Sequence, residues 1–294
     1  SRIAAIPPPS IHLSSPALIT TVAGARAWRA MRRRAGASVA LVPTLGNLHA
    51  GHAALIDRAR ALADFTLVSI FVNPTQFAPG EDYATYPRTL EHDRELAGAH
   101  TADAVFAPPP EQMYPRGTEA AVTVAVPALS GELCGAQRPG HFTGVASVVS
   151  RLLGIVQPEF AVFGEKDYQQ LLVIRRLVQD LFFETEIVAE PTVREADGLA
   201  LASRNRYLTP EERQRAPALY RALVAAAESV VAGAGTDTVA AQGRVALTAA
   251  GFRSEYFELR HGGDLGPPRR GEPRVILAAG WLGKARLIDN IRID

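Results

Sequence analysis

Two histidines three residues apart mark the first segment whose side chains could do chemistry. His49 and His52 lie in residues 43–52, where a short apolar run gives way to an amphipathic stretch. The N-terminus of a helix offers unpaired N–H groups and the positive end of its dipole, and Gly51 lets a ligand approach the backbone closely. The segment therefore suits a triphosphate, although loop histidines taken alone are as often structural.

A second charged segment, residues 164–170, also joins an apolar run to an amphipathic stretch. Lys166 could neutralise a phosphate, and Asp167 could cap a helix or contact a ribose or a metal. The simpler interpretation makes Asp167 a helix cap and Lys166 a solvated surface charge. The choice between them depends on what else the fold brings to this place.

Two further loops carry polar groups. The loop 197–206 combines Ser203 with Arg204 and could clamp phosphates, or it could be a polar linker. Asn73 and Gln76 follow an apolar run and could bind hydroxyl or carboxylate groups, although Asn-Pro also forms ordinary turns.

Other candidates lie between these segments. Asp93 begins an amphipathic stretch and could be a magnesium ligand, or it could simply stabilise the first turn of a helix. The stretch 131–144 contains Arg138 and His141 and suggests a mobile loop over a site. Cys134 has no evident base partner in the sequence, so we assign it no catalytic role.

These segments need a scaffold that brings them together. Apolar runs alternate with amphipathic stretches along residues 39–188, which predicts strands at 39–42, 67–72, 104–106, 160–163 and 185–188, and helices around 55–62, 90–99, 145–156 and 171–181. Aliphatic strands separated by helices bury both faces, so they predict a parallel, right-handed, doubly wound sheet. Ligands of such sheets lie beyond the carboxyl ends of the strands.

The residue composition and the apolar pattern of the sequence change after Pro191. Two alanine-rich helices are predicted at 210–231 and 238–250, followed by three short strands at 256–259, 275–278 and 286–288. The predicted architecture is α/β: a Rossmann-like doubly wound parallel sheet domain over residues 1–192, and a smaller C-terminal α+β domain over 193–294 that closes over the site. The first twenty residues, with Pro7, Pro8 and Pro9, are expected to form a tail or an edge segment.

Composition excludes several classes of protein. Lys and Arg number 31 against 30 Asp and Glu, so no global field would attract nucleic acid or an anionic membrane. One cysteine excludes an internal disulfide framework and favours a reducing compartment, the cytoplasm. No apolar run approaches the roughly 20 residues that span a bilayer, and no targeting segment is evident.

Six motifs in order together resemble the pantothenate synthetase family. They run from about residue 39 to 208: Pro-Thr-Leu-Gly-x-Leu-His-x-Gly-His, Phe-Val-Asn-Pro-x-Gln-Phe, Tyr-Pro-Arg-Thr, Arg-Pro-Gly-His-Phe, Phe-Gly-Glu-Lys-Asp and Ser-Arg-Asn. The resemblance implies an ATP- and magnesium-dependent condensation of (R)-pantoate with β-alanine through a pantoyl-adenylate intermediate, in a homodimer. The alternative is a nucleotidyltransferase that shares the His-x-Gly-His motif and acts on another small substrate.

The resemblance also implies roles for individual residues. The catalytic set would be His49, His52, Lys166 and Arg204. The ATP site would comprise Leu45, Gly46, His49, Gly51, His52, Gly164, Glu165, Lys166, Asp167, Val193, Leu201, Ala202, Ser203 and Arg204. Gln76 would contact pantoate and β-alanine, and Gln170 would contact pantoate, with Asn73 added to the substrate site and Asp93 as the candidate metal ligand.

Three positions depart from the family's usual pattern. Leu45 replaces a methionine, Ala50 an acidic residue and Ala202 a serine. Ala202 lacks a hydroxyl that could bind phosphate, a loss worth about 1 kcal/mol, so Ser203 and Arg204 must hold that end. We interpret His52 as a hydrogen-bond donor to the transition state rather than as a general acid.

Overall fold

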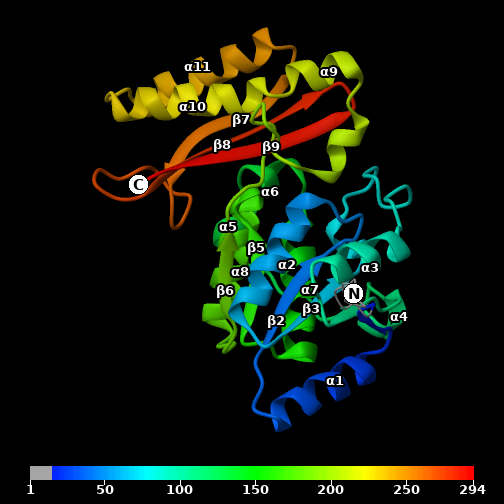
Figure 1. Ribbon diagram of the computed structural model, residues 1–294. Coiled ribbons are helices and arrows are strands. Elements are labelled where there is room, and N and C mark those ends of the chain that lie inside the picture. The colour runs from blue at the N-terminus through cyan, green and yellow to red at the C-terminus, as the bar shows by residue number, and fades with distance from the viewer. Residues whose placement is uncertain (1–14) are drawn as a thin grey trace, which may run out of the picture.

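A six-stranded parallel sheet forms the larger part of the molecule (Figure 1). The computed structural model describes residues 15–294, so the Pro7–Pro9 segment lies outside the described residues. Every neighbouring pair in the sheet is parallel. In spatial order the strands are β1 (Ala17–Ile19), β4 (Ala104–Phe106), β3 (Phe65–Ile70), β2 (Val39–Thr44), β5 (Phe160–Gly164) and β6 (Glu186–Glu190).

The strand order reverses beside β2. From β2 the chain moves outward to β3 and β4, and it then returns to place β5 on the other side of β2. Connections leave the two neighbouring strands toward opposite faces at such a switch point, which opens a crevice at their carboxyl ends. The predicted doubly wound sheet is confirmed.

Helices cover both faces of this sheet because its strands are apolar on both sides. Val39 and Leu41 of β2 are fully buried on the side of α1 (Val22–Arg34), α7 (His141–Val156) and α8 (Tyr168–Asp180). Ala40 and Val42 are buried on the side of α2 (Ala50–Leu62) and α3 (Leu90–Ala99).

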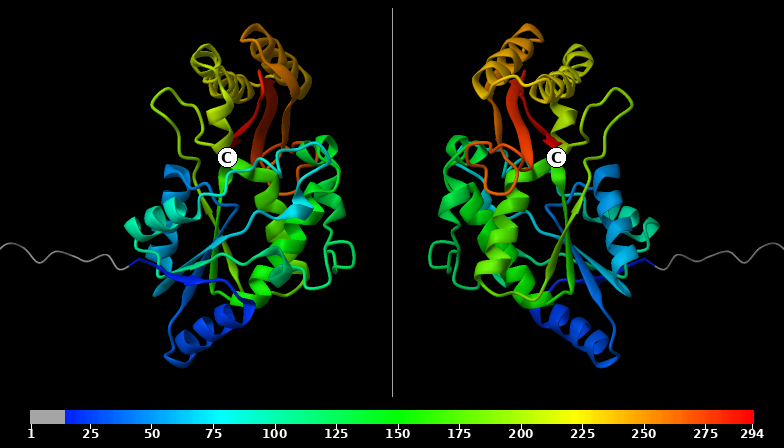
Figure 2. Two further views of the ribbon diagram at one scale, coloured as in Figure 1. Left: turned by 90° about the vertical axis from the view of Figure 1, so that its right-hand side faces the viewer. Right: turned by 90° about the vertical axis from the view of Figure 1, so that its left-hand side faces the viewer.

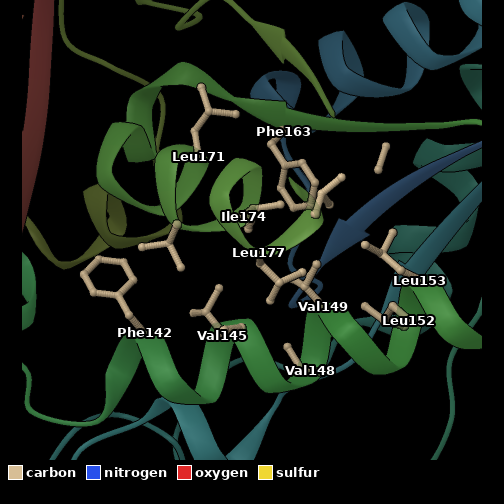
Figure 3. Packing of buried hydrophobic residues seen from close by; sticks show 14 of the residues in the cluster. Phe142, Val145, Val148, Val149, Leu152, Leu153, Phe163, Leu171, Ile174 and Leu177 are labelled. Carbon is tan, nitrogen blue, oxygen red and sulfur yellow. The ribbon is translucent and has the colours of Figure 1, made fainter. Parts of the chain in front are cut away.

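Helices α7 and α8 supply many of the buried apolar side chains of this core. Figure 3 shows Phe142, Val145 and Val149 of α7 on the side of that helix that faces α8. The remaining short helices are α4 (Pro110–Met113), α5 (Pro127–Ser130) and α6 (Cys134–Gln137), and the 3-10 turns are η1 (Pro74–Gln76), η2 (Glu165–Asp167) and η3 (Ser203–Tyr207).

The C-terminal part is an α+β unit that lies over the carboxyl ends of the parallel strands (Figures 1 and 2). Its antiparallel sheet has the order β7 (Arg253–His261), β8 (Arg274–Leu282) and β9 (Ala285–Ile293). One face packs against α10 (Ala218–Val231) and α11 (Thr236–Ala249). The other face joins the core of the larger sheet domain through Tyr256, Val275 and Leu277.

Several predicted boundaries were wrong. The predicted helix 210–231 is two helices, α9 (Pro210–Arg215) and α10, because Pro217 lacks an N–H and cannot continue a helix. The three C-terminal strands have nine residues each rather than three or four, and in β7 and β9 polar side chains interrupt the apolar pattern.

The N-terminal region also differs from expectation. Strand β1 does form a sheet edge, as predicted for part of the first twenty residues. Helix α1 was missed because only Ala25 and Trp28 supply its buried apolar face, beside the buried Arg29. The stretch 131–144 contains α6 and the start of α7 rather than one open loop.

No helix within residues 15–294 has the length and apolar character to cross a membrane.

A pair of helical glycines tests how tightly the C-terminal layer packs. A Cβ at Gly243 of α11 would overlap the fully buried Phe257 ring, whereas a Cβ at the exposed Gly154 of α7 would meet nothing. We expect Gly243→Ala to lower the free energy of unfolding by about 1–3 kcal/mol through overpacking. Gly154→Ala is the control and should raise it by up to about 1 kcal/mol. Urea denaturation measures both, and a more stable Gly243→Ala would contradict this packing.

Candidate functional site

A cavity of about 300 Å³ lies at the carboxyl ends of β2 and β5, beneath the C-terminal sheet. Its wall contains the predicted site residues that follow β2, β3 and β5 and that lie on the segment leading into η3. Those residues are Leu45, His49, Gly51, His52, Gln76, Gly164, Lys166, Asp167, Gln170, Val193, Leu201, Ala202, Ser203 and Arg204. Gly46, Asn73, Asp93 and Glu165 are not on the wall.

The two histidines at the start of α2 are held as neutral hydrogen-bond donors. The Gly51 N–H donates to His49 Nδ1 at 3.1 Å, and the His49 N–H donates to His52 Nδ1 at 3.3 Å. Because both Nδ1 atoms accept, a neutral ring must carry its proton on Nε2. Each histidine therefore offers one N–H to a ligand, and their ring centroids lie 4.2 Å apart.

Burial keeps these rings uncharged at neutral pH. Burial, and after it the positive charge of Lys166, lower the pKa of His49 to about 4. The pKa of His52 falls to about 3, first because of burial and then because of His49 and Lys166. The positive charge of Lys166 therefore lies close to two neutral hydrogen-bond donors on this wall, an arrangement that suits a phosphate.

Asp93 shapes the loop between β2 and α2. It is fully buried, and its two carboxylate oxygens accept the N–H groups of Asn47 at 3.0 Å and Leu48 at 2.7 Å and the Thr89 hydroxyl. Gly46 beside it has φ +84°, a conformation that L side chains rarely adopt. These hydrogen bonds favour a structural role for Asp93 over the predicted metal contact.

Lys166 and Asp167 form the turn between β5 and α8. The Lys166 Nζ lies 3.7 Å from Asp167 Oδ2. Burial raises the pKa of Asp167, but the charge of Lys166 and of nearby arginines outweighs it, so the pKa lies below its usual value. Asp167 makes no hydrogen bond that caps α8, so the simpler interpretation of this residue is not supported. Glu165 instead contacts Arg292 at 3.2 Å.

Asn73 orients Gln76 rather than lining the cavity. Its fully buried side chain donates to Gln76 Oε1 at 3.0 Å and to the Gly144 carbonyl at 3.2 Å, and it accepts from the Tyr114 hydroxyl at 2.6 Å. Since the Gln76 oxygen is engaged, the N–H groups of that amide remain for a ligand.

Arg138 and His141 belong to a fixed network. His141 donates from Nδ1 to the Gln76 carbonyl at 2.7 Å and accepts at Nε2 from Arg138 at 3.2 Å. Arg138 also holds Glu81 with two hydrogen bonds, at 2.6 and 2.7 Å. Burial and the Arg138 charge lower the pKa of His141 to about 4. These contacts tie down the stretch that the sequence suggested is mobile.

The η3 turn brings Ser203 and Arg204 to the cavity. Arg204 lies 3.3 Å from Asp82 Oδ1, a contact that sets the guanidinium at the rim. The C-terminal sheet adds wall residues that the sequence did not reveal: Tyr256, Arg286, Asp289 and Asn290. They lie on strands and belong to none of the six motifs, so no sequence signal marked them.

The buried histidines give the stability of the protein a defined pH dependence. Their pKa values are lower in the folded chain than the usual value near 6.5, so unfolding takes up protons below that pH. We expect the free energy of unfolding to fall as pH decreases from 6.5 toward 4. His52→Gln should flatten this dependence. Urea titrations at several pH values measure it, and an unchanged slope in His52→Gln would contradict the assignment.

The comparisons with known proteins agree with this geometry. The family model for pantoate-β-alanine ligase matches residues 17–292. Pantothenate synthetase of Chromohalobacter salexigens is 54% identical over 264 residues, which is 89% of this chain and 93% of the relative. Pantothenate synthetase of Azotobacter vinelandii is 52% identical and covers 94% of this chain and 98% of the relative.

Solved structures have the same fold. Pantothenate synthetase from Thermus thermophilus superposes with a TM-score of 0.85 at 49% identity, over 94% of this chain and 98% of that one. Pantoate-β-alanine ligase from Francisella tularensis, complexed with β-γ ATP and β-alanine, has a TM-score of 0.77 at 31% identity, over 94% and 97%. This chain therefore belongs to the pantothenate synthetase (pantoate-β-alanine ligase) family.

Proposed function

We propose that this chain condenses (R)-pantoate with β-alanine at the expense of ATP, releasing pantothenate, AMP and pyrophosphate. The observation that carries the proposal is the set of His49, His52 and Lys166 on one cavity wall at the switch point of the sheet. Family membership and the ATP- and β-alanine-bound relative support the substrates.

In the first step a pantoate carboxylate oxygen attacks the α-phosphorus of ATP. A P–O bond to the acid forms, and the bond to pyrophosphate breaks with its electron pair leaving on pyrophosphate. The reaction needs alignment and charge stabilisation rather than a protein nucleophile. Lys166 supplies the charge, and the Nε2–H groups of His49 and His52 supply donors for the phosphate oxygens.

In the second step the amine of β-alanine attacks the acyl carbon of the adenylate. The C–N bond forms, AMP leaves with the C–O electron pair, and the amine releases its extra proton to solvent. We assign Gln76 to both acids and Gln170 to pantoate, since both side chains are on the wall. Ser203 and Arg204 would hold phosphates from the opposite side.

Magnesium enters this proposal with the nucleotide. Residues 15–294 contain no cluster of three or more His, Cys, Asp or Glu side chains that could hold a metal. Mg²⁺ commonly takes most of its ligands from phosphate and water, so this wall fits a magnesium–ATP complex in which phosphate oxygens hold the ion. The ion would neutralise phosphate charge. The homodimer and the cytoplasmic location rest on the resemblance and on composition.

Product formation tests the proposal. The purified chain is incubated with magnesium, ATP and D-pantoate, with and without β-alanine, and AMP, pyrophosphate and the amide are quantified. We expect the amide with stoichiometric AMP only when both acids are present. If pantoate is inert but another acid or a phosphate ester releases pyrophosphate, the nucleotide site stands and the substrate assignment falls.

Lys166→Ala tests the role of the charge. Removing a donor aimed at transition-state charge typically costs about 10²- to 10³-fold in kcat. Lys284→Ala is the matched control, because Lys284 is exposed in the turn between β8 and β9. We expect the loss of kcat in Lys166→Ala alone, with both melting temperatures close to that of the parent. Near-normal turnover of Lys166→Ala would remove Lys166 from the mechanism.

A further inference from the structure

The turn that carries Lys166 accepts hydrogen bonds from a side chain of the C-terminal domain. The side-chain Nδ2 of Asn290, in β9, donates to the Glu165 carbonyl at 2.8 Å and to the Lys166 carbonyl at 3.0 Å. Both carbonyls belong to the single 3-10 turn η2. A primary amide can present two N–H groups from one nitrogen, so this side chain joins two successive carbonyls.

Asn290 is itself held rigidly. The Asp289 Oδ1 atom accepts the backbone N–H of Asn290 at 2.8 Å. The same carboxylate is bound by two nitrogens of Arg194, at 2.6 and 2.9 Å. The Arg194 guanidinium lies 3.8 Å from the Tyr220 ring centroid. Asp289 and Asn290 are both buried, at 4% and 6% exposure, so these bonds are shielded from water.

This network connects the C-terminal domain to two parts of the cavity wall, the turn of Lys166 and the segment that begins at Val193. Arg194 follows Val193, and its guanidinium also donates to the Gly198 carbonyl at 3.1 Å. Arg194 thereby orders the segment that leads to Leu201. Through Asp289, the same guanidinium supports Asn290 and the turn of Lys166.

We infer that Asn290 is a positioning residue, which holds the backbone of η2 so that the Lys166 ammonium stays beside His49 and His52. The inference deepens the proposed function, on which it rests for the role of Lys166. Lys166 has a long side chain, and its only ion pair within residues 15–294 is the 3.7 Å contact with Asp167. Its position therefore depends on the backbone that carries it.

The position of Lys166 has a readout that does not require catalysis. The Lys166 charge is a cause of the low pKa of both histidines, second to burial for His49. A displaced Lys166 would raise the pKa of His49 without exposing the ring. Loss of overall stability alone would not produce this change in the folded protein.

Asn290→Leu is the test variant, because leucine is of similar size, uncharged and unable to donate. Arg292→Gln is the control: Arg292 lies two residues further along β9 and contacts the Glu165 side chain rather than the backbone. The histidine Cε1–H resonances of the free proteins are followed by NMR from pH 7.5 to pH 5, and kcat and KM for ATP and pantoate are measured.

We expect the titration of His49 to begin at a higher pH in Asn290→Leu than in the parent and in Arg292→Gln. In Asn290→Leu, kcat should fall by about 10- to 100-fold, the scale of loss from a misplacement of about 1 Å, with smaller changes in KM. If Asn290→Leu does not fold, Asn290→Ala is measured with the same expectations.

An unchanged His49 titration together with a parent-like kcat in the folded variant would overturn the inference. The titration also separates this inference from the proposed function. If the parent makes no pantothenate but His49 shifts in Asn290→Leu, the substrates are wrong and the positioning role stands.

Discussion

The parallel pairing of β2 with β5, through Ala40 with Phe160 and Leu41 with Ala161, is the constraint on which the site depends. These strands are neighbours in the sheet although more than a hundred residues separate them along the chain. The segments that follow them lead to α2 on one face and α8 on the other, so a crevice opens between their ends. His52 and Lys166 both line the crevice because His52 lies in the first turn of the helix that follows β2, and Lys166 lies in the turn that follows β5.

Electrostatics then decides what the crevice can bind. Burial lowers the pKa of both histidines, so the rings are neutral at neutral pH. Backbone N–H groups donate to both Nδ1 atoms, so the ring proton of each histidine is on Nε2. Each neutral ring can therefore donate its Nε2–H to a phosphate oxygen beside the Lys166 charge. Asp93 does not line the cavity, but its carboxylate accepts the backbone N–H groups of Asn47 and Leu48 and so orders the loop that leads to the histidines. The donors are thus oriented before a ligand arrives, which is how a polar site stabilises transition-state charge.

Sequence reasoning predicted the elements with strong apolar periodicity, and α3 and β4 agree with their predicted ranges to the residue. Most of the residues that it assigned to the site do lie on the cavity wall, since the main motifs follow strand ends. It could not tell which polar side chains face the cavity: Asn73 is hydrogen-bonded to Gln76 and Gly144, and Asp93 to the backbone of Asn47 and Leu48. Asn290 lies in no motif, and its role arises only where two domains meet.

The central claim of the proposed mechanism is that an acid carboxylate attacks the α-phosphorus of ATP between Lys166 and the two histidines. The most direct measurement uses pantoate labelled with ¹⁸O in both carboxylate oxygens, in a complete reaction with ATP, magnesium and β-alanine. Mass spectrometry should find one labelled oxygen in AMP and one in the amide product, because the C–O bond of the adenylate breaks in the second step. Unlabelled AMP, or label recovered in phosphate or pyrophosphate, would contradict the claim.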